Sequence, residues 1–403
     1  MKYIHGRYVD SKYIHIIRSL IYIKNGGIIM KRKLSILLSS VLTATFLMAG
    51  CSVSGKEQGN ENTPGTETKG EKVKVGFVYM GPITDKGYVY AHDLGRQAIE
   101  KELGVETIYK ENVKEDKSEA RAVIDNLIQQ GANVIFTTSF GFMDATEEAA
   151  EDYPEVKFLH SSGYKSNGTN FINYFGKIEE ARYLSGIAAG LKTKTNKIGF
   201  VAAFPIPEVI RGIDAFTLGV QSVNPDAVVK VTWANTWYDP AKEKEAAKAL
   251  IDGGVDVLAQ HQNSASVQQA AEEKGIYSVG YNLDMAEYAP NAYMTGAVWN
   301  WGAYYVEAVK QIQEGTWKAE NYLGGLKEGV VELAPLTDNA PAEAKEKIEK
   351  AKEDIISGNL NVFRGPIKDQ TGTVRVEEGK VLTDEEMLEI DYLIEGVEGI
   401  IEQ

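Results

Sequence analysis

From residue 73 onward, short runs of β-branched and other apolar residues alternate with longer stretches in which apolar residues recur every three or four positions. The short runs predict strands, and the longer stretches predict helices. The first predicted elements are a strand at 75–79, a helix at 87–103, a strand at 105–109, a helix at 117–130, a strand at 134–137, a helix at 143–152 and a strand at 156–160. This alternation is typical of a parallel sheet covered by helices on both faces.

The pattern then repeats with an offset of 123 residues. The matching segments are Lys74–Val78 with Lys197–Val201, Asp116 with Asp239, Leu127–Gly131 with Leu250–Gly254, and Asn133–Phe136 with Asp256–Ala259. A generic likeness between α/β segments rarely keeps one offset over several elements. We therefore expect an α/β fold of two Rossmann-like lobes, each with a parallel sheet, joined by a hinge that closes the lobes around a ligand.

The N-terminal region has the features of an export signal. Lys31-Arg32-Lys33 precedes an apolar stretch, Leu34–Leu47, that is too short to span a membrane. The stretch ends in Leu-Met-Ala-Gly-Cys51, which resembles a bacterial lipobox and predicts lipidation of Cys51, with a chance cysteine after a short core helix as the alternative. We expect residues 30–50 to be a lipoprotein signal peptide, and residues 1–29 to be an extension upstream of the true start at Met30.

The remaining segments have distinct expected roles. Residues 51–72 are rich in Gly, Ser, Thr, Asn and Glu and predict a flexible linker. We expect the N-terminal lobe to comprise residues 73–193 plus about 300–325, and the C-terminal lobe 194–299 plus about 326–403. A lipid anchor and a linker would hold these lobes, as a monomer, at the extracellular or periplasmic face of the cell membrane.

Composition argues against several classes of function. The 403-residue chain has 43 Lys and Arg, 57 Asp and Glu and a formal net charge of −14, which argues against a nucleic-acid partner because such binding needs clustered cations. The single cysteine excludes a disulfide framework, and the few histidines argue against a metal centre. No metalloprotease, nucleophile-elbow or dinucleotide motif is present. We therefore expect a protein that is not an enzyme and has no cofactor or metal.

Two features that imitate enzyme motifs have simpler explanations. Gly186 and Gly190 resemble a phosphate-binding loop, but their spacing is wrong and they fall within a helical pattern, which predicts close helix packing. His160 precedes Ser161, but the sequence places no orienting acid beside this pair.

Aromatic and polar residues gather where the predicted strands end, which is where ligands bind in open α/β sheets. The candidate ligand-binding residues are Asp85, Tyr88, His92, Ser139, Phe140, Phe204, Trp237, Gln260, His261, Asn282, Asp284 and Trp299. Flat aromatic faces beside fixed hydrogen-bonding groups suit a planar heteroaromatic ligand. We expect Tyr88 and Trp237 to sandwich this ligand and Trp299 to form a wall.

The edges of the ligand would contact polar side chains. The candidates for this role are Asp85, Ser139, Gln260, His261, Asn282 and Asp284. For His92 and Phe204, packing within the fold is the alternative to ligand contact. For Asp239 we expect a helix cap rather than a ligand contact.

Several segments together resemble the basic membrane protein (BMP) family of substrate-binding lipoproteins. These segments are Val75–Tyr79, Asp85–Tyr88, Leu127–Phe136, Trp237–Pro240, Gly280–Asp284 and Thr295–Trp299. The resemblance covers residues 72–330 and implies the two-lobed type I periplasmic-binding-protein fold. It also implies a purine or nucleoside ligand, an ABC permease as partner, and an aromatic stacking role for Trp237.

Two departures from the family pattern bear on the ligand. Asn282 stands where nucleoside-binding relatives usually have Asp, and Trp299 stands where they usually have Lys. Those two residues are associated with gripping the ribose. Their replacement predicts a free purine base, such as adenine, rather than a nucleoside.

Other functions stay open from the sequence alone. The same fold serves sensory lipoproteins that signal through a receptor, and aromatic side chains also stack on sugars. A hydrolase such as a nucleosidase would need an acid/base pair in the cleft and would show turnover instead of stoichiometric binding.

Overall fold

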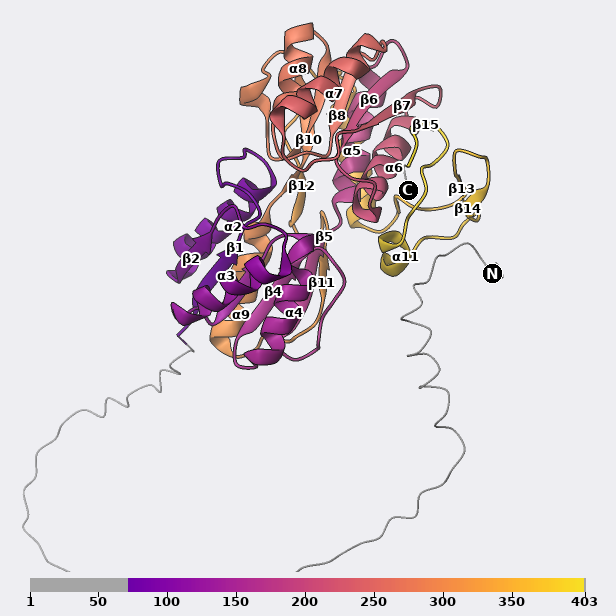
Figure 1. Cartoon of the computed structure of the whole chain (residues 1–403). Coiled ribbons are helices and arrows are strands. Elements are labelled where there is room, and N and C mark those ends of the chain that lie inside the picture. Colours follow the sequence, from indigo (N-terminus) through magenta and orange to yellow (C-terminus); the bar gives the residue numbers. More distant parts are fainter. Residues whose placement is uncertain (1–71, 402–403) are drawn as a thin grey trace, which may run out of the picture. The chain divides into compact units, whose positions relative to one another are not determined.

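Two open sheets, each packed against helices, make up the computed structural model, which describes residues 72–401 (Figure 1). The expected extension at 1–29, the signal peptide at 30–50 and the lipidation site Cys51 lie outside the described residues, as does the predicted linker up to residue 71. No helix of the described part is long and apolar enough to cross a membrane.

The first sheet contains six strands, all parallel. In spatial order they are β11 (Tyr322–Gly324), β5 (Phe171–Gly176), β4 (Lys157–Ser161), β3 (Val134–Thr137), β1 (Lys74–Val78) and β2 (Glu106–Lys110). Strand β1 reads as an almost continuous apolar run because both faces of this central strand are covered. Phe77 of β1 stacks on Phe136 of β3 with 4.9 Å between ring centroids, at the centre of one core.

Four helices accompany this sheet: α2 (Tyr88–Leu103), α3 (Lys117–Gln129), α4 (Met143–Asp152) and α9 (Trp301–Glu314). Helix α4 begins directly after a short 3₁₀ turn, η1 (Phe140–Phe142). Helix α9 comes late in the chain, yet it packs against α2, and the orange α9 lies among the violet elements in Figure 1.

The second sheet has seven strands and is parallel except for the antiparallel pairing of β12 with β10. In spatial order they are β12 (Val331–Leu333), β10 (Tyr293–Trp299), β9 (Tyr277–Asn282), β8 (Val257–Gln260), β6 (Lys197–Ala202), β7 (Val228–Trp233) and β15 (Val397–Glu398). Its accompanying helices are α5 (Ile178–Lys192), α6 (Pro207–Gln221), α7 (Pro240–Asp252) and α8 (Ser266–Lys274), and a 3₁₀ turn, η2 (Ala286–Tyr288), follows β9.

The two sheets repeat one plan, which confirms the predicted two α/β lobes. The order β5-β4-β3-β1-β2 of the first sheet recurs as β10-β9-β8-β6-β7 in the second. Asp116 accepts hydrogen bonds from the backbone at the start of α3, and Asp239 does so at the start of α7. Both residues are therefore N-caps, as their matching positions predict.

The chain passes between the sheets after β5, after β10 and after β11. Helix α5 precedes the expected lobe boundary at residue 193, but it packs against α6 and β10. A Cβ atom at Gly190 of α5 would lie 2.7 Å from the carbonyl oxygen of Val220, and one at Gly186 would collide with the carbonyl oxygen of Phe216. This close approach confirms that the two glycines serve helix packing.

The C-terminal segment packs on the second sheet. Helix α10 (Ala344–Ile356) packs against α5, and β15 extends the sheet beyond β7. Between them lie the hairpin of β13 (Ile367–Lys368) and β14 (Val374–Val376) and the short helix α11 (Asp384–Leu388). Apolar side chains of this segment join the core beneath α6, namely Phe363, Ile367, Val376, Ile390, Leu393 and Ile394.

Candidate ligand-binding site

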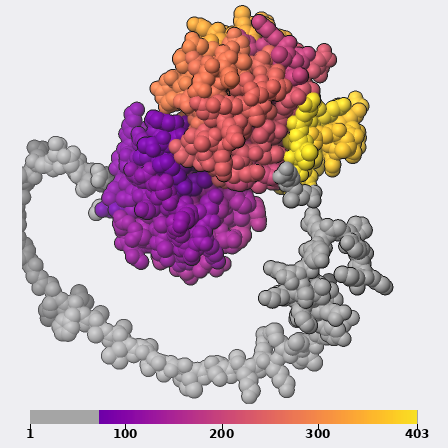
Figure 2. Space-filling view, turned by 45° about the horizontal axis from the view of Figure 1, so that its top comes forward, coloured from indigo at the N-terminus to yellow at the C-terminus, as the bar shows by residue number. Residues whose placement is uncertain are grey.

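An open pocket, with about 370 Å³ of empty space that includes space open to solvent, lies between residues of the first lobe and residues of the second. It is lined by Met80, Tyr88, Ser139, Phe140 and Ser162 from the first lobe, and by Glu208, Trp237, His261, Asn263 and Tyr281 from the second. In the space-filling view, the indigo-to-violet surface of the first lobe meets the red-to-orange surface of the second (Figure 2).

Loops at the carboxyl ends of the strands supply most of this lining. Met80 follows β1, Ser139 follows β3, Ser162 follows β4, and Asn263 follows β8. This placement obeys the rule for open α/β sheets.

Aromatic rings make up much of the wall. Tyr88, which begins α2, is nearly buried, and its hydroxyl lies 3.1 Å from Ser161 Oγ. Across the pocket, the ring of Trp237 lies 6.2 Å from that of His261, which lies 4.5 Å from that of Tyr281. Phe140 is 46% exposed, so its ring is accessible to a ligand.

The polar part of the wall centres on Glu208. This residue occupies the first turn of α6 after Pro207. Ser162 Oγ donates a hydrogen bond to Glu208 Oε2 at 3.0 Å, and His261 Nε2 lies 3.7 Å from Glu208 Oε1. Burial raises the pKa of Glu208, but His261, Arg211 and Ser162 outweigh it and hold the pKa below its usual value. Burial lowers the pKa of His261 to about 4, so the pocket contains an ionised carboxylate beside a neutral imidazole.

Asn282 and Trp299 contact each other behind the pocket. Trp299 Nε1 donates to Asn282 Oδ1 at 3.1 Å, while Asn282 Nδ2 donates to the carbonyl oxygen of Gln262 at 3.1 Å. Asn282 has a φ of +72°, a left-handed conformation that Asn tolerates better than most residues. The Trp299 ring stacks on Trp301 with 4.6 Å between centroids, and neither Asn282 nor Trp299 is among the lining residues.

Four other predicted residues are not among those that line the pocket. The Asp85 carboxylate accepts hydrogen bonds from the backbone N–H groups of Gly87, Val89 and Tyr90, so it caps the start of α2. Asp284 is exposed and accepts from the N–H of Ala286. Gln260 Nε2 donates to the carbonyl oxygen of Ser264 at 2.8 Å. His92 stacks on Trp301 in the core, with Nδ1 2.5 Å from the Tyr305 hydroxyl.

The predicted residues therefore divide into three groups. Those that line the pocket are Tyr88, Ser139, Phe140, Trp237 and His261. Phe204 stands directly behind the wall, its ring 5.1 Å from that of Trp237. The others contact backbone, core or each other. Short polar side chains such as Asp85 and Asp284 pair with the nearest free N–H group, whereas the rings of His92 and Trp299 stack on Trp301.

Sequence reasoning missed several lining residues. Met80, Ser162, Asn263 and Tyr281 all stand at or just beyond strand ends, so the signal that identified their neighbours also applied to them. Glu208 had no such signal, because an acidic residue in the first turn of a helix is common for electrostatic reasons alone.

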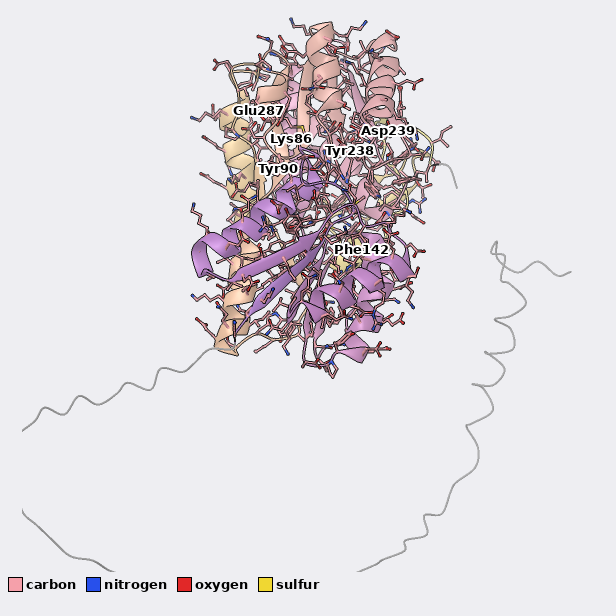
Figure 3. All side chains as sticks on the ribbon, turned by 60° about the vertical axis from the view of Figure 1, so that its left-hand side comes forward. Lys86, Tyr90, Phe142, Tyr238, Asp239 and Glu287 are labelled. Atoms are coloured by element: carbon pink, nitrogen blue, oxygen red, sulfur yellow. The ribbon has the colours of Figure 1, made fainter. Side chains whose placement is uncertain are left out.

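The lobes also touch beside the pocket. A Cβ atom at Gly87 would lie 2.5 Å from the carbonyl carbon of Asn263. In Figure 3, Lys86 and Tyr90 of the first lobe lie beside Glu287 of the second. The Tyr288 hydroxyl and the Glu287 carboxylate raise the pKa of Lys86. The structure thus has its lobes in contact on this side.

The remaining features do not suggest catalysis. His160 is fully buried, its Nδ1 lies 2.9 Å from Thr137 Oγ1, and burial lowers its pKa to about 3. No group of three His, Cys, Asp or Glu side chains in residues 72–401 could hold a metal ion. The arrangement is suited to non-covalent binding of a small planar molecule.

Comparisons with known proteins agree with this geometry. The sequence matches the family described as Bmp, ABC transporter substrate-binding protein PnrA-like, over residues 72–363. It is 43% identical to a purine-binding protein of Brucella abortus over 83% of this chain and 95% of that protein. It is 39% identical to a putative ABC transporter glucose-binding protein of Haloferax volcanii over 86% of each chain.

A solved structure of similar fold is an ABC transporter solute-binding protein from Aeropyrum pernix. It superposes with a TM-score of 0.63 at 21% identity, over 74% of this chain and 93% of that one. At this identity the likeness concerns the fold alone. The chain has the type I periplasmic-binding-protein fold that the sequence resemblance implied.

Proposed function

Because the chain belongs to the Bmp family of ABC transporter substrate-binding proteins, we propose that its pocket captures a purine base and delivers it to an ABC permease. The family consists of binding proteins for ABC transporters rather than enzymes. The observation that carries the proposal is an aromatic pocket between two lobes, with a carboxylate, hydroxyl groups and an imidazole among its walls. Stacking favours any flat ring, and the polar groups select its edge.

Tyr88 and Trp237 are the proposed stacking residues, one from each lobe. Closure of the lobes would bring both rings onto the ligand, and the accessible ring of Phe140 would shield it from water. A sequence relative named for purine binding, 43% identical over nearly its whole length, supports a purine rather than another planar ligand.

The Asn282–Trp299 pair supports a free base over a nucleoside. The two side chains satisfy each other through a 3.1 Å hydrogen bond and are buried. They offer no charged pair to the hydroxyl groups of a ribose. A nucleoside would leave those hydroxyl groups without the partners that the family resemblance assigns to them, and an unpaired buried polar group is costly.

The location of the protein is also proposed. Lipidation of Cys51 and a linker at 51–72 would tether the two lobes, as a monomer, to the extracellular or periplasmic face of the membrane. Mass spectrometry of the purified membrane fraction tests this directly. A mature chain that begins at lipidated Cys51 supports the proposal, and a chain that retains residues 30–50 contradicts it.

A thermal-shift screen tests the ligand. The purified chain is melted with adenine, guanine, hypoxanthine, adenosine, guanosine, uracil and glucose. A ligand present at 100 times its dissociation constant stabilises the folded state by about 2.7 kcal/mol, which is readily detected. A shift with a free base but not with its nucleoside supports the proposal, and no shift with any purine refutes it.

A sugar is the second candidate ligand. The observation that favours it is the 39% identity to a protein named as a putative glucose-binding protein. Aromatic walls with carboxylate and hydroxyl groups also suit sugars. A shift with glucose in the same screen, and none with the bases, would select this candidate.

A further inference from the structure

Glu208 is a feature of the pocket to which the proposed function gives no specific role. Among the described residues that line the pocket, it is the one acidic side chain, and no Lys or Arg is among them. Its side chain is 18% exposed, so part of it faces the open space. It lies in the first turn of α6, where the helix dipole favours negative charge.

We propose that Glu208 determines specificity by accepting a hydrogen bond from an N–H group on the edge of the bound base. It would select heteroaromatic bases that present an amino or ring N–H group, and it would reject anionic relatives such as nucleoside monophosphates. This inference rests on the proposed function, because it names the hydrogen-bonding class of the same ligand.

The serine and tyrosine hydroxyl groups of the first lobe that line the pocket already have partners. Ser139 Oγ donates to Glu115 Oε1 at 2.5 Å, so its hydrogen is not available to a ligand. The Tyr88 hydroxyl pairs with Ser161, and Ser162 donates to Glu208 itself. Glu208 therefore stands out as the charged lining group with acceptor capacity to spare, beside the unpaired Nδ1 of His261.

The acceptor capacity follows from carboxylate chemistry. An ionised carboxylate offers about four lone-pair sites. Ser162 occupies one at 3.0 Å, and His261 approaches the other oxygen at 3.7 Å, longer than a good hydrogen bond. A ligand N–H can take a remaining site, and the low-dielectric aromatic wall makes that bond stronger than it would be in water.

The same contacts suggest a competing explanation. Ser162 belongs to the first lobe and Glu208 to the second, so the role of their hydrogen bond could be limited to holding the lobes together. We call this role a latch. Recognition and latching differ in what happens when Ser162 loses its hydroxyl group. If Glu208 is a latch, Ser162→Ala loses ligand affinity as Glu208→Gln does. If Glu208 recognises the ligand, Ser162→Ala keeps the carboxylate and most of the affinity.

The experiment compares three variants of the full chain with the wild type by titration calorimetry with adenine, guanine and hypoxanthine. Glu208→Gln replaces one acceptor by a donor at almost unchanged volume. Ser162→Ala removes the Ser162–Glu208 hydrogen bond between the lobes and keeps the carboxylate. Asp284→Asn is the matched control, because it removes one negative charge from an exposed site on the same lobe.

We expect Glu208→Gln to weaken the tightest-binding base by roughly ten- to a hundredfold, the usual cost of losing a hydrogen bond to a charged group. Ser162→Ala alters a lining residue but keeps the carboxylate, so it should weaken binding clearly less than Glu208→Gln does. Asp284→Asn should stay within about threefold of the wild type. We also expect adenosine monophosphate not to bind the wild type. The unliganded melting temperature of each variant shows whether it folds, and Glu208→Asp, with the charge on a shorter side chain, replaces Glu208→Gln if that variant does not.

Two results would overturn the inference while leaving purine capture intact. One is wild-type affinity in Glu208→Gln, or in Glu208→Asp where that variant has to replace it. The other is an equal loss in Ser162→Ala and Glu208→Gln, which would make Glu208 a latch. If the wild type binds none of the three bases, the proposed function itself fails and this inference falls with it.

Discussion

Gly87 allows the closest backbone approach between the lobes beside the pocket, so its replacement by alanine should oppose closure. A Cβ atom there would lie 2.5 Å from the carbonyl carbon and 2.7 Å from the Cα of Asn263. Carbon atoms in contact normally stand about 3.5–4.0 Å apart, so the lobes would have to separate by roughly 1 Å. Both partners are backbone, so neither can rotate away as a side chain would.

The expected size of the effect follows from overpacking. Inserting a methyl group into a filled site costs about 1–3 kcal/mol. Gly87→Ala can avoid this cost by staying open, so the penalty should appear in ligand binding rather than in folding. We therefore expect purine affinity to fall by about 5- to 150-fold, with little change in the unliganded melting temperature.

Titration calorimetry and small-angle X-ray scattering test this prediction together. Gly87→Ala should bind more weakly, and its radius of gyration should shrink less when the ligand is added. Gly81→Ala is the matched control in the same loop, because a Cβ atom there meets only Val89 Cγ2, at an ordinary 3.5 Å. Wild-type affinity in Gly87→Ala would refute the reasoning, since it would mean that the bound form does not need this contact.

Three further predictions concern stacking, ribose rejection and pH. Trp237→Ala should lose about 1–3 kcal/mol of purine binding in calorimetry, while Tyr238→Ala, next to it but 43% exposed, should not; equal losses would contradict stacking by Trp237. The double variant Asn282→Asp with Trp299→Lys should gain nucleoside binding relative to base binding in a thermal-shift assay, and an unchanged preference would contradict the ribose argument. Because burial lowers the pKa of His160 to about 3, the unfolded chain binds a proton there below about pH 6.5 while the folded chain does not. This group should therefore lower the free energy of unfolding by about 1.4 kcal/mol per pH unit as pH drops from 6.5 towards 3. When the free energy of unfolding is measured by urea at several pH values, its slope against pH should be shallower by one proton in His160→Gln than in the wild type. Equal slopes would show that His160 does not remain neutral.

The predicted strands and helices agree closely with the structure because their signals are local. The strand at 134–137 and the helix at 143–152 have the predicted bounds, and the other elements differ by a residue or so at their ends. Apolar periodicity records which face of each element is buried, and it survives in the sequence without any knowledge of partners. The repeat could be detected for the same reason, since two copies of one lobe keep the same apolar pattern.

The residues of the pocket could be predicted only in part from the sequence. Strand ends can be located from the sequence, and that was enough to identify Tyr88, Trp237 and His261 as lining residues. The sequence does not show in which direction a polar side chain at such a strand end points. Asp85 turns back onto the N–H groups of its own helix, and Asp284 onto that of Ala286, because each loop presents a closer donor than the pocket does.

Local sequence patterns were thus enough to predict the elements, their repetition in two lobes and the edge of each sheet where the pocket lies. Which side chains meet at the pocket depends on the packing of the two lobes. Glu208 comes into contact with Ser162 and His261, and Gly87 with Asn263, only when lobes far apart in the chain are brought together. The physical reason is that secondary structure depends on patterns within a few turns or strands, whereas a binding site depends on distances that only packing between lobes sets.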